Sequence, residues 1–193
     1  MRKGEGFVGW GRVATFTASG PERFEQAQEW WRQVTAEAIV RDDVDEPGTG
    51  PIAFGSMAYS RRSETESVLV VPEVVVGRRG GLAWVTTTTT DATVPPADEP
   101  LMPQPAPTSP GEVDFIDRDL DAPSWALAVE EAVARISAGA LDKVVLARAV
   151  QASASRRIDP RWVLTRLAED YDTTWVFAVD GLVGATPEML VRL

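Results

Sequence analysis

Seven prolines stand between residues 95 and 110, and this stretch constrains the fold more than any other part of the chain. Proline has no backbone N–H to donate and its ring fixes φ, so the stretch cannot form the interior of a helix or of a central strand. We therefore expect a Pro-rich linker or loop over residues 95–120. It divides the 193 residues into an N-terminal section, 1–94, and a second section, 121–193.

The N-terminal section predicts a β-rich subdomain with one amphipathic helix. After Pro21, apolar residues recur at spacings of three and four from Phe24 to Ala38, which is the period of one helical face. Pro72 indicates a sheet edge or a bulge, and the sequence RRGG at 78–81 indicates a hairpin turn. Runs rich in β-branched and aromatic residues predict strands in a meandering antiparallel sheet: 7–17, 52–59, 67–76 and 82–90.

The second section combines helix signals with strong strand signals. Asp121-Ala122-Pro123 and Asp159-Pro160 each predict the start of a helix. The first helix is expected to stop at Gly139, and the second at about Ala168. The predicted strands are LDKVVLARAV, residues 141–150, and a hairpin in TTWVFAVDGLVGA, residues 173–185, around Asp180-Gly181. Because strands and helices do not alternate regularly, we predict an α+β fold of largely antiparallel sheets flanked by helices.

The chain contains no Cys and no His, which restricts the chemistry that it can carry. Disulfides, thiolate metal sites and cysteine nucleophiles are excluded, and so are the commonest general base and the commonest transition-metal ligand. Any acid or base must therefore be Lys, Glu, Asp or Tyr.

Charge and hydropathy exclude several kinds of partner. A net charge of −10 opposes binding to nucleic acid. No apolar run approaches the roughly 20 residues that span a bilayer, and the start, RKGEG, lacks the apolar segment of a secretory signal. We expect a cytoplasmic protein that binds neither nucleic acid nor membrane. The sequences GWG and GRRGG lack the context of a phosphate loop, so no cofactor-binding residue is predicted.

Lys143 is an unusual residue at the head of the apolar stretch LDKVVLAR. From these eight residues alone, a solvated strand end explains it, because the lysine stem can lie along apolar surface while the ammonium reaches water. The surrounding motifs favour a functional interpretation instead.

Two motifs in the second section carry a resemblance to a known family. LDKVVLAR follows a predicted helix that ends in Gly, and GATPEML follows about forty residues later, after a Trp-Val-Phe strand and an Asp-Gly turn. In this order they resemble the chorismate-utilising enzymes, and within that family they look most like isochorismate synthase. AFGSMAYS and the Pro-Glu within SVLVVPEVVV are similar to the family's N-terminal half. The resemblance therefore runs along most of the chain.

The resemblance implies roles for two residues. Isochorismate synthase adds water to ring carbon two of chorismate while the hydroxyl at carbon four leaves, so it needs a base and an acid on opposite faces. By motif match the general base is Lys143, at the lysine of the family's KVVLAR motif, and the general acid is Glu188, at the glutamate of its SPE-type motif. Thr186 stands where Ser is more usual, a small change that leaves the Glu188 assignment in place.

The identity of residue 143 also separates this chain from some relatives. Family members that use ammonia carry a glutamine-type residue at this position, because ammonia needs no base to become nucleophilic. Lys143 therefore points to water as the nucleophile. Salicylate synthases share this lysine, so a salicylate synthase-type lyase stays open as an alternative.

Both roles require a protonation state that is rare in solution. A lysine with its reference pKa of about 10.4 is almost wholly protonated at pH 7 and cannot accept a proton. Apolar neighbours such as Val145 are expected to favour a neutral Lys143, and partial burial beside Met189 is expected to favour a protonated Glu188. On a regular strand Arg148 lies on the face opposite Lys143, which predicts a structural ion pair rather than a substrate contact.

Other parts of the family's site fall outside this sequence. In the family, the magnesium-binding glutamates and the basic residues that hold the substrate carboxylates lie downstream of the SPE-type motif, and this sequence stops five residues after Glu188. Mg²⁺ is expected as a cofactor by resemblance, with its ligands downstream of Leu193. Residues 121–193 would then be the first part of the chorismate-binding catalytic region, truncated.

The prediction is an isochorismate synthase, an isomerase, that is inactive as this chain alone and is completed by the missing C-terminal half. The alternative from a different class is a non-catalytic remnant or interaction module of the same fold. Family members supply isochorismate to menaquinone, siderophore or salicylate synthesis, and no residue of the chain distinguishes these pathways.

Overall fold

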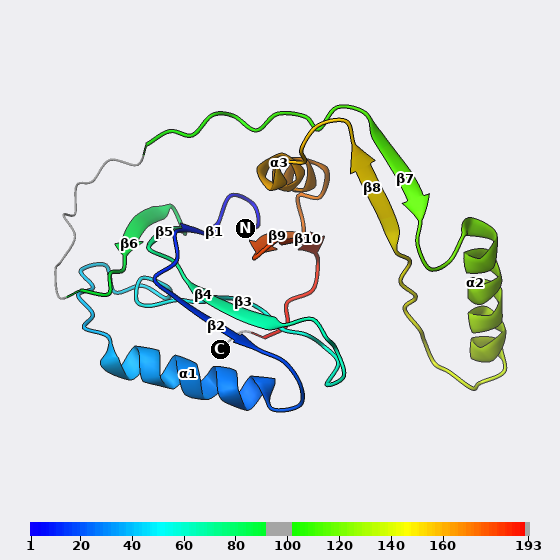
Figure 1. Cartoon of the computed structure of the whole chain (residues 1–193), viewed down its shortest axis with the longest axis horizontal. Helices are drawn as coiled ribbons and strands as arrows, with labels where there is room; N and C mark the ends of the chain where they lie inside the picture. The colour runs from blue at the N-terminus through cyan, green and yellow to red at the C-terminus, as the bar shows by residue number, and fades with distance from the viewer. Residues whose placement is uncertain (92–101, 192–193) are drawn as a thin grey trace. The chain divides into compact units, whose positions relative to one another are not determined.

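The structure, a computed structural model, describes residues 1–91 and 102–191. The strand pairings among these residues are antiparallel, and three helices accompany them (Figure 1). This confirms the predicted α+β class. The chain forms two compact units, Met1–Ala106 with Pro160–Leu193 (unit 1) and Pro107–Asp159 (unit 2). The domain boundaries drawn from the sequence stay a prediction.

Unit 1 holds two three-stranded sheets instead of the single meander that was expected. The first sheet has the spatial order β1 (Gly6–Trp10), β5 (Val74–Arg79) and β6 (Leu82–Thr87). The second sheet has the order β2 (Ala14–Ala18), β4 (Ser67–Val71) and β3 (Phe54–Ser56). The chain passes from the second sheet to the first at Pro72, between β4 and β5. Because proline cannot donate a hydrogen bond to a ladder, Pro72 ends one strand and lets the next join another sheet.

Two hairpins in unit 1 have the turns that their sequences predict. Gly80 and Gly81 join β5 to β6 with φ of 58° and 84°, and Asp180 and Gly181 join β9 (Trp175–Val179) to β10 (Leu182–Thr186) with φ of 47° and 88°. Positive φ at both central residues is the type I′ geometry that matches the twist of the flanking strands. The predicted hairpin turns are therefore confirmed.

The second hairpin is packed by a helix and joined to the start of the chain. Helix α3 (Pro160–Asp170) contacts both β9 and β10. The N–H of Val176 donates to the carbonyl of Met1 at 2.8 Å, and the Met1 ammonium donates to the carbonyl of Val176 at 2.5 Å. At the other end of the hairpin, Arg12 forms an ion pair with Asp180 at 2.5 Å. Unit 1 is thus assembled from two separate stretches of sequence.

Helix α1 (Arg23–Glu37) lies where the periodicity predicts it and packs on β2. The rings of Trp30 and Phe16 stack at 5.5 Å between centroids, which fixes the helix on the sheet. The buried apolar side chains come from α1, both sheets and β9: Ala18, Ala27, Val68, Val70, Val71, Val75, Trp84 and Val176. Among the described residues, no helix is long and apolar enough to cross a membrane.

Arg23 is a buried cation that the sequence pattern did not indicate. Its side chain lies at the start of α1, and the residue is 3% exposed. The guanidinium donates to the carbonyls of Gly20, Ala58 and Tyr59 at 2.9, 2.7 and 2.7 Å. These three bonds satisfy the buried donors and tie the helix start to the loop after β3.

Unit 2 consists of a two-stranded sheet and one helix. Strand β7 (Val113–Asp117) pairs with β8 (Val150–Ala154), and α2 (Ala122–Ser137) lies between them in sequence. The Asp121 carboxylate accepts from the amide of Ser124 at 2.9 Å, and Gly139 follows the helix with φ of 72°. The predicted helix, its cap and its stop are therefore confirmed.

Unit 2 contains one strand that the sequence did not predict, and one predicted strand is not formed by its described residues. The range 95–120, expected as a linker or loop, contains strand β7. Within the predicted strand 141–150, only Val150 lies in a strand, and residues 143–149 have no regular structure. No described strand of unit 2 pairs with residues 143–149, and a segment with strong β propensity needs such a neighbour before it becomes a strand.

Candidate active site

Lys143, the candidate base, lies in unit 2 on the segment before β8. Its side chain is exposed, and its neighbour Val145 is 89% exposed. The apolar surroundings that were expected to favour a neutral amine are therefore absent from the residues described in unit 2. The strand-face argument is also wrong, because residues 143–149 are not in a strand.

Arg148 anchors the end of the same segment. Its Nη2 donates to Oδ1 of Asp117 at the end of β7, and its Nε donates to the carbonyl of Leu120 at 3.4 Å. This confirms the predicted structural ion pair. Hydrogen bonds from Ser124 lower the pKa of the Asp121 carboxyl, and the nearby positive charge of Arg148 lowers it further.

Glu188, the candidate acid, follows β10 in unit 1. Its side chain is exposed, and Met189 beside it is 46% exposed, so the expected partial burial is also absent. The amide of Glu188 donates to the hydroxyl of Thr186 at 3.1 Å. Pro187 between them has no N–H to donate, and the bond from Glu188 to Thr186 fixes the start of the segment that carries the carboxylate. Serine has the same hydroxyl, which explains why Thr186 can stand where the family more often has serine.

The two candidates lie in different units of the structure. Lys143 belongs to unit 2 and Glu188 to unit 1. The local contacts of each motif are therefore defined, while a single site that contains both the base and the acid stays a prediction.

Comparison with known proteins identifies the family of the chain. The sequence pattern of the family described as chorismate binding enzyme matches residues 1–193. The chain belongs to the chorismate-binding enzyme family. Isochorismate synthase MenF of Bacillus subtilis is 37% identical to it over 78 residues, which make up 38% of this chain and 17% of that protein. No solved structure matches the chain.

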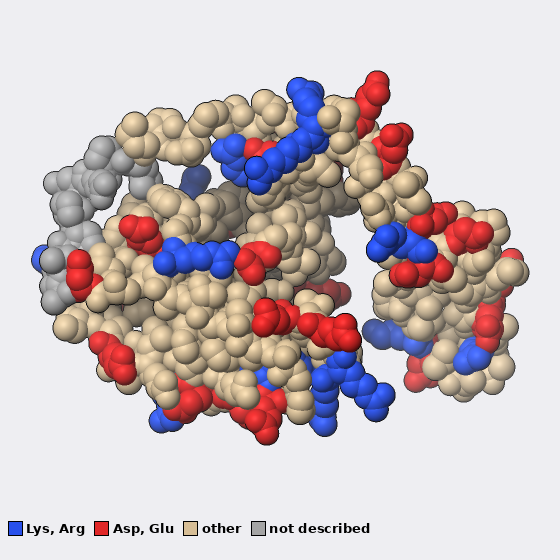
Figure 2. Space-filling view, viewed as in Figure 1, with Lys and Arg blue, Asp and Glu red and all other residues tan. Residues whose placement is uncertain are grey.

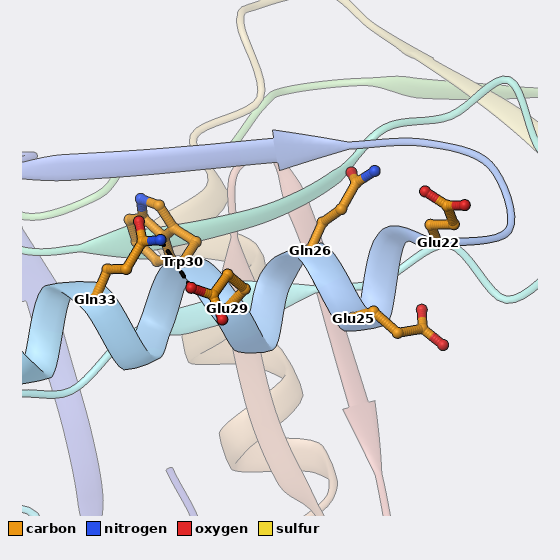
Figure 3. Close-up of a pocket in the computed structure, with 6 residues that line it drawn as sticks. All are labelled: Glu22, Glu25, Gln26, Glu29, Trp30 and Gln33. Atoms are coloured by element: carbon orange, nitrogen blue, oxygen red, sulfur yellow. Dashed lines mark hydrogen bonds between the residues drawn. The ribbon is translucent and has the colours of Figure 1, made fainter.

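A chorismate-binding enzyme must accommodate a ligand with two carboxylates, and one groove of unit 1 is unsuitable for that purpose. The groove runs along α1 and has a volume of about 670 Å³ (Figure 3). Six residues line it: Glu22, Glu25, Gln26, Glu29, Trp30 and Gln33. Figure 2 shows acidic side chains over the part of unit 1 where Figure 1 places α1. Three carboxylates without a free cation would repel a dianion.

The chemistry of this groove is set by contacts on the helix itself. Hydrogen bonds from Arg32 and then Gln33 lower the pKa of Glu29. Gln33 donates to Oε1 of Glu29 at 2.8 Å, as the dashed line in Figure 3 shows. The spacing of Glu22, Glu25 and Glu29 on one helical face could have revealed this acidic stripe from the sequence. We assign no role in chorismate binding to it.

The family resemblance also implies Mg²⁺, and the described residues do not fit this ion. Among residues 1–91 and 102–191, no group of three or more acidic side chains is placed to hold a metal ion.

Proposed function

We propose that the chain takes part in an isochorismate synthase reaction, in which water adds to carbon two of chorismate and the hydroxyl at carbon four leaves. The observation that carries the proposal is Lys143 within LDKVVLAR in a chain of the chorismate-binding family. The similarity to an isochorismate synthase supports the same reaction. That similarity covers 17% of the relative, so the activity is proposed for the full-length product of the gene.

In the proposed reaction, the two candidate side chains move protons in opposite directions. Neutral Lys143 takes a proton from the attacking water, and protonated Glu188 gives a proton to the departing hydroxyl. The reaction therefore requires both side chains at one bound chorismate, on opposite faces of its ring. Because both are exposed in their own units, the surfaces that desolvate them must come from outside those units.

The chain offers a clean test of the base, because its lysines are Lys3 and Lys143. We would incubate the full-length product with chorismate and magnesium and separate the products by chromatography. Lys143→Ala is expected to lower the rate of isochorismate formation by about 10²–10⁴-fold, the usual contribution of a general base. Lys3→Gln, the matched control, is expected to leave the rate unchanged.

Other outcomes of this assay assign other functions. Salicylate with pyruvate would assign the lyase alternative, since salicylate synthases carry the same lysine. Isochorismate formation that survives in Lys143→Ala would overturn the role of this residue. No product from the full-length wild type would leave the non-catalytic interaction module as the assignment.

A further inference from the structure

The paired ladder of unit 2 ends beside the segment that carries Lys143. Strands β7 and β8 pair as far as Asp117 and Val150. Beyond this point residues 143–149 run outside any strand. Arg148 therefore stands at the junction between the part of the chain that is held in the sheet and the part that is not.

The Arg148 side chain ties this junction to two neighbouring points. It donates to the carboxylate of Asp117 and to the carbonyl of Leu120. The side chains of Arg148 and Asp117 are 28% and 39% exposed, against 62% and 66% for the Arg135–Glu131 pair on α2. A pair that is less solvated is screened less by water and salt, so it holds its geometry better.

Any effect of this anchor on Lys143 passes through the backbone. Arg148 is a cation, so it would repel Lys143 when the amine is protonated and could not hold it by a direct ion pair. A chain of five residues can span up to about 17 Å, which exceeds the screening length of about 8–10 Å in ordinary buffers. Anchoring one end of such a segment restricts the directions that the other end can take.

We propose that Arg148, held by Asp117, is a positioning residue for Lys143. Arg148 fixes the direction in which the LDKVVLAR motif approaches β8. It thereby fixes the position of the Lys143 amine relative to the attacking water. The inference rests on the proposed role of Lys143 as the base. A displacement of about 1 Å at a reacting group costs about 100-fold in rate, while contacts that hold chorismate elsewhere are unaffected. Loss of the anchor should therefore change kcat and leave KM in place.

The kinetic test uses the full-length product. Arg148→Met is expected to lower kcat by about 10–100-fold with little change in KM. Arg148→Lys should recover part of the loss, and exchange of the charges in Arg148→Asp with Asp117→Arg should be more active than either single variant. Arg135→Met, which removes an exposed ion pair of the same unit, is the matched control and should keep its kcat. An Arg148→Met variant with unchanged kcat would overturn the inference.

A second readout needs no activity. Lysyl endopeptidase cuts after lysine, so cleavage after Lys143 reports the freedom of the motif and cleavage after Lys3 serves as the internal reference. In Arg148→Met, cleavage after Lys143 should be about tenfold faster relative to that after Lys3. Faster cleavage with unchanged kcat would make Arg148 a structural anchor only and would overturn positioning.

The two readouts also separate this inference from the proposed function. If the full-length wild type makes no isochorismate, the proposed function fails and positioning of a base fails with it. The cleavage rates then still decide whether Arg148 anchors the segment, and equal rates in wild type and variant would refute the anchor as well.

Discussion

Units 1 and 2 both carry clear strand and helix signals, yet among the described residues the buried apolar side chains all lie in unit 1. Val75 and Trp84 of unit 1 are 2% and 6% exposed. Helix α2 of unit 2 buries none of its residues, and its Leu127 is 65% exposed. The two units thus differ in what their helices pack against. Helix α1 lies on β2, and α2 has no such surface among the residues described in its own unit.

This difference has an energetic meaning. Removal of apolar area from water contributes about 25 cal/mol per Å², so the side chains of unit 1 stabilise it while those of α2 contribute little in unit 2 alone. Secondary structure in unit 2 depends instead on local devices, such as the Asp121 cap, and on the β7–β8 ladder. Substitutions in unit 1 should therefore change the free energy of unfolding more than matched substitutions in unit 2.

The largest effect is expected at Gly77 of β5. A Cβ built there would lie 2.3 Å from the Trp84 ring, so Gly77→Ala must displace a buried side chain. Overpacking of this kind costs about 3 kcal/mol. Gly50, whose Cβ would meet nothing within 4 Å, gives the matched control Gly50→Ala. Urea unfolding of both variants measures the difference, and equal stability of the two would contradict the packing of unit 1.

A smaller effect is expected from truncating equivalent valines in the two units. Val75→Ala removes two methyl groups from the core and should cost about 2 kcal/mol in the free energy of unfolding. Val145→Ala, at a position 89% exposed, should change it by less than about 0.5 kcal/mol. Denaturant melts followed by Trp fluorescence measure both changes. A cost of more than about 1 kcal/mol at Val145 would show that unit 2 buries this segment after all.

The smallest effect concerns pH and involves one carboxyl in each unit. The hydroxyl of Thr49, followed by the amides of Asp45 and Val44, lowers the pKa of Asp42 in unit 1. Hydrogen bonds from Ser124 lower the pKa of Asp121 in unit 2. A lowered pKa in the folded state gives stability that is present above the unfolded pKa of about 3.9 and is lost as pH falls through the folded value.

Two variants separate these contributions. Asp42→Asn should flatten the acid dependence of unit 1, and Asp121→Ser, which keeps a cap without a titrating group, should flatten that of unit 2. NMR signals of Trp84 and Trp125 in an acid titration report the two units separately. The shifts should be small, because both carboxyls are exposed to solvent. An unchanged acid profile in both variants would argue against these hydrogen bonds.

The elements that the sequence predicted correctly are those with local causes. Three- and four-residue periodicity located α1, Asp121 and Gly139 bounded α2, and Asp180-Gly181 placed the β9–β10 turn. Each of these signals acts within a few residues, so a linear sequence contains it in full.

The features that sequence reasoning missed depend on residues far apart in the chain. The pairing of β1 with β5 joins residues 6–10 to 74–78, and no local signal selects that partner over β2. Arg23 is buried because three carbonyls converge on it, which only the folded chain can show. Lys143 was expected in a strand because its motif has strong β propensity, but propensity does not supply the neighbouring strand.

The same limit applies to the candidate site. The two motifs identified Lys143 and Glu188 as candidates through the family, and their positions in different units could not be foreseen from spacing. The Arg148–Asp117 pair was foreseen only as an unnamed ion pair, because its partner comes from a strand within the predicted linker.

The discontinuity of unit 1 has a consequence for how the protein is made. On the ribosome Met1 emerges before its partner Val176, which lies beyond the whole of unit 2. At about 5–20 residues per second, residues 107–159 alone delay the second stretch of unit 1 by about 3–11 seconds. During this interval the sheets of residues 1–91 exist without α3, β9 and β10. A nascent chain of this protein therefore exposes an unfinished sheet surface for seconds, the state in which a holding chaperone would be of most use.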